Sequence, residues 1–168
     1  MAETGDISDH IISTGNGADT APAIALISQY VKDLSFENPN APAVYQWQEQ
    51  PQIDVQFNIG AERVGDDVVE VALKIEVKAT ASQGAAFAVE LLYAALFGMR
   101  NVPEEQMQPF MLAEAPRLIF PFARRVLADA IRDGGFPPLL LDPIDFGALY
   151  MQQAQQMEVT TGEPAGTA

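Results

Sequence analysis

Two alternating segments joined by a short acidic turn constrain this fold more than any other feature. In residues 52–59 and again in 69–78, large apolar residues occupy every second position. Successive side chains of a strand point to opposite faces, so each segment is typical of a strand with one buried face. Gly65-Asp66-Asp67 between them favours a tight turn. The sequence therefore predicts an antiparallel hairpin. Its inward residues are Ile53, Val55, Phe57 and Ile59, then Val69, Val71, Leu73, Ile75 and Val77.

Residues 85–99, AAFAVELLYAALFGM, come next and give conflicting signals. Alanine and leucine favour a helix by intrinsic propensity. Consecutive strands usually pair as neighbours, however, so the position of this segment favours a third strand. The run is too short to span a bilayer and contains Glu90. We predict a strand, with Phe87, Val89, Leu91 and Tyr93 inward and Ala86, Ala88 and Glu90 on its outer face.

A further strand is predicted at residues 30–37, before the hairpin. A period of two places Tyr30, Lys32, Leu34 and Phe36 on one face and Val31, Asp33, Ser35 and Glu37 on the other. This pattern indicates a strand with an acidic outer side. Pro39 and Pro42 end it, because proline cannot donate a hydrogen bond to a neighbouring strand.

The last third of the chain predicts helices. Residues 104–114 indicate a short helical or irregular piece, and residues 115–135 a long amphipathic helix that ends at Gly134. Pro121 is expected in its first turn, where a missing N–H costs little. Asp145 is the predicted N-cap of a final helix. The buried side of the long helix is predicted to carry Leu118, Phe122, Val126 and Ile131. Strands followed by helices indicate the α+β class.

Length and local composition predict one folded domain, residues 24–157, between two tails. Residues 1–23, which include His10, and residues 158–168 are small and polar and are expected to be mobile. The N-terminus lacks the basic start and apolar core of a signal peptide, so a cytoplasmic protein is expected.

Charge and residue usage exclude several functions. A net charge of −14 repels nucleic acid and anionic membrane surfaces. The absence of cysteine excludes a disulfide framework, a thiolate metal site and a cysteine nucleophile. The carboxylate pairs are explained by a turn, a helix first turn and an N-cap; they are Asp66 with Asp67, Glu104 with Glu105, and Asp142 with Asp145. The residues therefore predict a binding protein rather than an enzyme, with no metal and no cofactor.

Two stretches, KDLSFENPNAP and FPFAR followed by GGFPPLLLDPIDFGALY, resemble the SecB family of bacterial protein-export chaperones. The resemblance runs in order over residues 28–155. It implies a four-stranded antiparallel sheet with helices packed on one face, assembling as a dimer of dimers, a homotetramer. It also implies an ATP-independent chaperone that binds unfolded preproteins in apolar grooves and delivers them to the SecA motor.

The resemblance further implies two sets of site residues. The zinc-bearing basic tail of SecA is expected on Asp33, Glu37 and Glu90, with Ala88 where the family often carries a larger apolar residue. The client groove is expected to include Val44, Tyr45, Trp47, Leu141 and Phe146. For Tyr45 and Trp47, packing of their loop onto the sheet is an equally good explanation.

Two other functions stay open on the sequence. One is a SecB-like chaperone dedicated to a toxin–antitoxin partner. The other is a small-ligand carrier or an enzyme built on an α+β sheet, which only the apolar content and the carboxylate pairs suggest.

Overall fold

The chain folds as one antiparallel sheet with helices on one side. A computed structural model describes residues 21–161; most of the two predicted tails, with His10, lies outside this range. The strands are β1 (Ala23–Glu37), β2 (Gln52–Gly65), β3 (Val68–Ala81) and β4 (Gly84–Arg100). The helical segments are η1 (Ala43–Gln46), α1 (Glu104–Pro109), the π-helical turn η2 (Phe110–Glu114), α2 (Ala115–Asp133) and α3 (Phe146–Thr161). The predicted α+β class and four-stranded antiparallel sheet are confirmed.

The strand order is β1-β4-β3-β2, so β3 and β4 form the centre of the sheet. The predicted hairpin is β2 and β3, with Phe57 opposite Ile75. The ambiguous segment is β4, with Leu91 opposite the same Ile75. A strand at 85–99 is therefore confirmed, and its helical propensity is overridden by pairing on both sides. The outward position expected for Ala86 is wrong: Ala86 is an extra residue at a register shift in β4 and is buried in the core beside Phe87.

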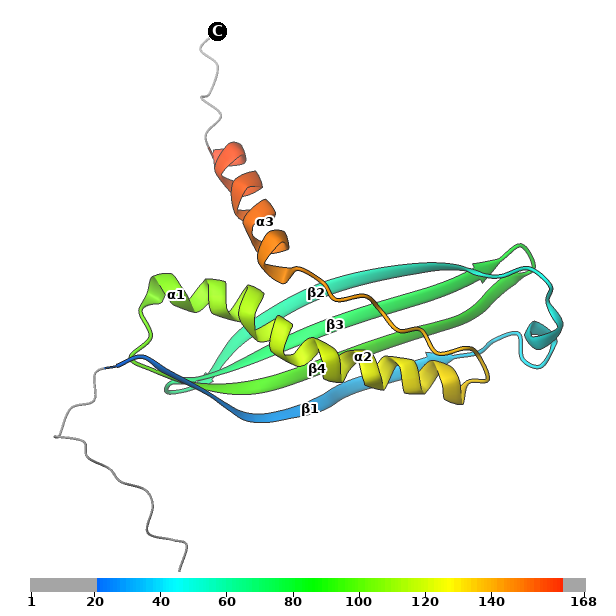
Figure 1. Ribbon diagram of the computed structural model, residues 1–168, viewed down its shortest axis with the longest axis horizontal. Coiled ribbons are helices and arrows are strands. Elements are labelled where there is room, and N and C mark those ends of the chain that lie inside the picture. Colours follow the sequence, from blue (N-terminus) through cyan, green and yellow to red (C-terminus); the bar gives the residue numbers. More distant parts are fainter. Residues whose placement is uncertain (1–20, 162–168) are drawn as a thin grey trace, which may run out of the picture.

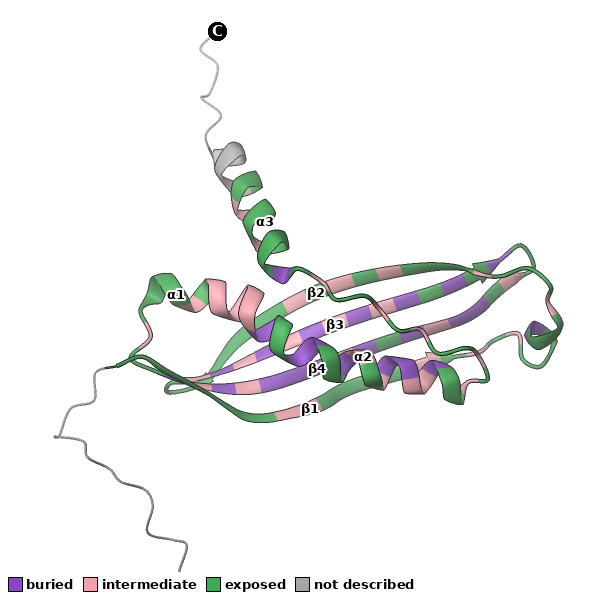
Figure 2. Cartoon of the chain, viewed as in Figure 1, coloured by how far each residue is buried: buried purple, intermediate pink, exposed green. Residues whose placement is uncertain are grey.

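The core lies between the sheet and α2. Every second residue of β3 and β4 is buried on the helix side, which gives the purple and pink alternation of Figure 2. Ile75 and Leu91 face Ile119, Leu127 and their neighbours in one cluster, and all four are fully buried. Each such side chain contributes about 1.5–3 kcal/mol relative to an exposed one. These residues pack the sheet against α2 and so determine which face of each strand is exposed to solvent.

Two expectations for α2 are wrong. Leu118 and Phe122 are 41% and 42% exposed rather than buried. Pro116 occupies the first turn, and Pro121 lies inside the helix. Ile131 is buried, as predicted, but the stripe that it completes consists of Ala115, Ile119, Ala123 and Leu127. In both stripes apolar residues recur about every four positions. The stripe that contains the small alanines lets the helix approach the sheet more closely, so this stripe packs inward.

The face assignment within β1 is also corrected. Val31 lies opposite Tyr93 and Asp33 opposite Leu92, so Lys32 is an extra, bulged residue. Beyond the bulge Asp33 lies on the outer face, as predicted, but before it the alternation reverses. Val31 faces the helices. Tyr30 and Lys32 lie on the outer face, where they contact Glu70 of β3.

Helix α3 projects away from the sheet (Figure 1) and is held at its first residue. Phe146 is buried, and its ring lies 5.9 Å from that of Phe120. The predicted N-cap is confirmed, because Asp145 Oδ1 accepts a hydrogen bond from the Ala148 N–H at 2.9 Å. None of the helices in the described range is long and apolar enough to cross a membrane.

Candidate functional site

The outer face of the sheet, opposite the helices, collects the predicted acidic residues into one surface, named here the docking face. Cross-strand register arranges it in three rows across β1, β4 and β3. The rows are Glu37–Ala88–Lys78, Ser35–Glu90–Glu76 and Asp33–Leu92–Lys74. Directly opposed residues of an antiparallel pair have Cβ atoms about 4.5–5.5 Å apart. The structure therefore places all four predicted residues on one face: Glu37 directly opposite Ala88, Glu90 in the next row and Asp33 in the row beyond it.

A shallow depression of about 220 Å³ lies in the docking face. Its polar walls include Glu37, Lys78 and Glu90, and Ala88 lies among them. A methyl group at Ala88 leaves room that a longer side chain would fill. The surface can therefore receive a side chain from outside and surround it with carboxylates.

Glu76 is an acidic member of this face that the sequence analysis missed. It lies directly opposite Glu90, and two like charges in that position repel each other. Lys74 Nζ lies 2.9 Å from Glu76 Oε1, and this contact holds the pKa of Glu76 below its ordinary value while it raises the pKa of Lys74. Glu76 therefore stays ionised at neutral pH. The predicted outward position of residue 76, together with the β3–β4 register, was the signal that could have found it.

A second group, of aromatic residues, lies on the helix side at the end of α2. The ring of Tyr45 lies 5.6 Å from Phe136, which lies 4.7 Å from Phe87. The Tyr45 hydroxyl donates to the Gly134 carbonyl at 2.8 Å, and Asn38 Nδ2 donates to the same oxygen at 3.2 Å. Tyr45 is still 51% exposed, so it forms the solvent edge of an otherwise covered cluster.

The other groove candidates are less accessible. Val44 and Phe146 are buried, and Trp47 and Leu141 are half-buried against the core. Val44, Tyr45 and Trp47 lie in or directly after η1, whereas Leu141 lies on the segment between α2 and α3 and Phe146 is the first residue of α3. The Leu141 carbonyl accepts a hydrogen bond from Arg124 at 3.1 Å, which ties that segment to α2.

Within residues 21–161, no group of three or more His, Cys, Asp and Glu side chains could hold a metal ion. The notable features are two surfaces on opposite sides of the same strands, one acidic and one apolar and aromatic. Surfaces of these two kinds are suited to binding other polypeptides, so they make the chain a candidate member of the class of polypeptide-binding proteins.

Comparison with known proteins identifies the family within that class. The family described as preprotein translocase subunit SecB matches residues 17–157. A protein-export protein SecB of Rhizorhabdus wittichii is 70% identical over 154 residues, which cover 91% of this chain and 93% of that protein. The SecB of Sphingopyxis alaskensis is 67% identical over 156 residues, 91% of each chain. This chain belongs to the SecB family of protein-export chaperones.

Solved structures support the fold. The SecB-like chaperone of Mycobacterium tuberculosis, solved with a ChAD peptide from an antitoxin, superposes with a TM-score of 0.59. The superposition covers 72% of this chain and 90% of that one at 15% sequence identity. At this identity the similarity concerns the fold alone.

Proposed function

We propose that this chain is an ATP-independent cytoplasmic chaperone that binds unfolded preproteins on its helix side and the zinc-bearing basic tail of SecA on its docking face. The observation that carries the proposal is the register of β1 against β4, in which Glu37 lies opposite Ala88, Glu90 lies in the next row and Asp33 in the row beyond it. The SecB relatives, protein-export proteins by name, support the same role.

Electrostatics favours a cationic partner at the docking face. The whole chain carries a net charge of −14, and the three rows of this face contain four carboxylates and two lysines. Opposite charges steer a basic segment to such a surface and align it there, and salt weakens the effect. Ala88 offers little apolar area, so charge contributes a larger share of the binding than a bulkier residue there would allow.

Clients require a different surface, one that accepts many sequences. Exposed apolar side chains on the helix side include Tyr45, Ile53 and Leu140, the last 68% exposed. An extended polypeptide can place apolar side chains on such positions while its backbone bonds to a rim. Each site contributes little, so a long client binds through several of them and is still released.

Assembly into a homotetramer is part of the proposal. The edge strand β1 exposes apolar residues, among them Ile24, Leu26 and Val31, and no strand formed by residues 21–161 pairs with its outer edge. Helix α2 exposes a second apolar stripe with Leu118 and Phe122. Both surfaces are suited to a further copy of the chain. Light scattering at micromolar concentration is expected to give the mass of four chains; a stable monomer would contradict the assembly.

The proposed function is tested with several unrelated unfolded preproteins and one antitoxin peptide, each titrated against the purified chain by fluorescence anisotropy. Binding to most of the preproteins is expected, since apolar area rather than exact sequence selects them. Binding to the antitoxin peptide alone would overturn the proposal in favour of a dedicated toxin–antitoxin chaperone.

Tyr45→Ala is expected to weaken client binding by about tenfold, because it removes the exposed aromatic edge of the groove. The matched control is Tyr45→Phe, which keeps the ring on Phe136 and loses only the hydroxyl that bonds to Gly134. The control should bind clients nearly as the parent does. Unchanged client affinity in Tyr45→Ala would mean that the ring only packs the loop onto the sheet.

A further inference from the structure

The bulge in β1 places two consecutive residues of opposite charge on the same face of the sheet. In a regular strand, neighbours point to opposite faces. Here Lys32 is the extra residue, and both it and Asp33 lie on the outer face. An exposed lysine next to an exposed aspartate would ordinarily form an ion pair with it. Such a pair would neutralise one of the carboxylates proposed to bind SecA.

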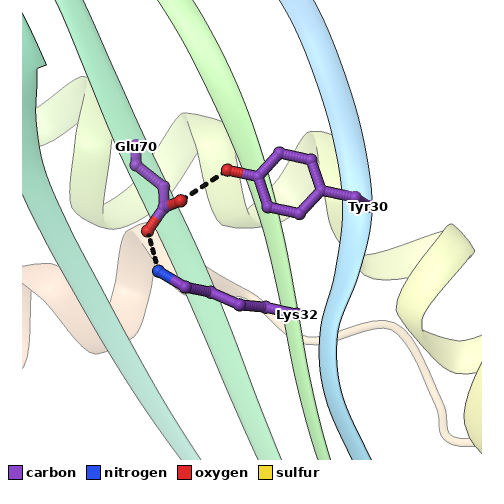
Figure 3. A network of polar contacts seen from close by, with 3 residues as sticks. All are labelled: Tyr30, Lys32 and Glu70. Atoms are coloured by element: carbon purple, nitrogen blue, oxygen red, sulfur yellow. Dashed lines mark hydrogen bonds and ion pairs between the residues drawn. The ribbon is translucent and has the colours of Figure 1, made fainter.

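The Lys32 ammonium is engaged elsewhere, as Figure 3 shows. Its Nζ lies 2.6 Å from Oε1 of Glu70, a residue of β3 two strands away. The Tyr30 hydroxyl donates to the other carboxylate oxygen, Oε2. Both contacts pass over β4, where Ala94 lies opposite Tyr30 and its small side chain leaves room for them. Of the ion pairs found in the described range, none includes Asp33.

The Glu70 carboxylate is well suited to hold this cation. Its side chain is only 13% exposed, so water competes weakly for it. Lys32, and then Tyr30, hold the pKa of Glu70 below its ordinary value, so the carboxylate is charged at neutral pH. Glu70 in turn raises the pKa of Tyr30 to about 12, so the hydroxyl remains a donor over the whole physiological range. One carboxylate thus binds two donors from the same strand.

We propose that Glu70 is a positioning residue of the docking face: by binding the Lys32 ammonium it keeps that cation from Asp33 and leaves the Asp33 carboxylate open to a basic partner. This inference rests on the proposed docking of SecA. Glu70 itself touches no partner. It acts by binding the Lys32 ammonium at a distance from Asp33.

The test is a rescue experiment that uses a synthetic zinc-loaded peptide of the basic SecA tail. Glu70→Gln, which keeps the size of the side chain and removes its charge, is expected to weaken peptide binding by about fivefold, because freed Lys32 pairs with Asp33. Lys32→Met alone is expected to bind at least as tightly as the parent. The double variant Glu70→Gln with Lys32→Met is expected to recover the parental affinity.

A purely structural role for Glu70 predicts a different pattern, in which Lys32→Met is also damaging and the double variant shows no rescue. Either result would overturn the inference. A readout without any partner checks the network itself: ultraviolet titration of the tyrosines should show one group near 12 in the parent, and Glu70→Gln should lower it toward 10.

A further variant tests the docking proposal independently of the role of Glu70. Asp33→Asn should weaken binding of the same peptide in the parental background. If Asp33→Asn leaves the affinity unchanged, the docking assignment of Asp33 is wrong. If Asp33→Asn weakens binding while Glu70→Gln does not, the docking face stands and the role of Glu70 is wrong.

Discussion

Replacing Gly134 with alanine is expected to lower the free energy of unfolding by about 3 kcal/mol, the upper end of the usual cost of overpacking. An added methyl group would lie 2.1 Å from Cζ and 2.5 Å from Cε1 of the Phe36 ring. The backbone of Gly134 has a negative φ of −77°, which alanine adopts freely, so the close approach alone is tested. Phe36 cannot simply turn away, because its ring stacks on Phe87 at 6.1 Å.

Urea unfolding at one fixed protein concentration measures the effect, since assembly makes apparent stability depend on concentration. The control is Gly60→Ala, whose new methyl group would meet nothing within 4 Å. It should be nearly neutral. Combining Gly134→Ala with Phe36→Leu should cost less than the sum of the two single changes, because the smaller side chain makes room. Full stability of Gly134→Ala would contradict this account of the α2 end.

Glu90→Lys is expected to weaken binding of the zinc-loaded SecA tail peptide by about tenfold or more at low salt. The change removes a carboxylate from the middle row of the docking face and puts a cation in its place. The fold should tolerate it, because the side chain points outward and the new ammonium lies opposite Glu76. Client binding, on the other side of the sheet, should be nearly unchanged.

Glu105→Lys provides the matched control for this charge reversal. Glu105 is exposed on α1, on the helix side of the sheet and outside the three rows. Both variants change the net charge equally. A local contact predicts a large loss for Glu90→Lys and a small one for Glu105→Lys. Equal losses that vanish together at high salt would instead indicate a long-range field and refute the assignment to Glu90.

Where one side of a strand is strongly apolar, the sequence alone was enough to assign its faces. The alternation in β2 and β3 predicted both strands and their inward residues. The position of residues 85–99 predicted β4 and the outward direction of Glu90 correctly, against its helical propensity. In these strands one register buries a whole set of large side chains, and any other register exposes them.

The wrong face assignments in β1 and α2 have a common cause: in each element the sequence is compatible with two different buried faces. In β1 an extra residue reverses the alternation, and no residue next to Lys32 in the sequence marks it; the side chain that Lys32 contacts, Glu70, lies 38 positions away. In α2 two apolar stripes compete, and close packing of alanines decides between them. Glu76 was missed because a carboxylate on a strand is ordinarily a solvated residue, and only the register places it opposite Glu90.

Successive residues of strand β4 serve two different functions. Val89 and Leu91 are buried in the core, and Glu90 between them lies on the docking face. Substitution at one position therefore leaves the other function intact. Insertion or deletion of a single residue within the strand would exchange the two faces beyond that point, unless a bulge absorbed the change. We therefore expect β4 to tolerate a change of length less readily than a change of residue. Viable length variation among relatives should be confined to the turns that join the strands.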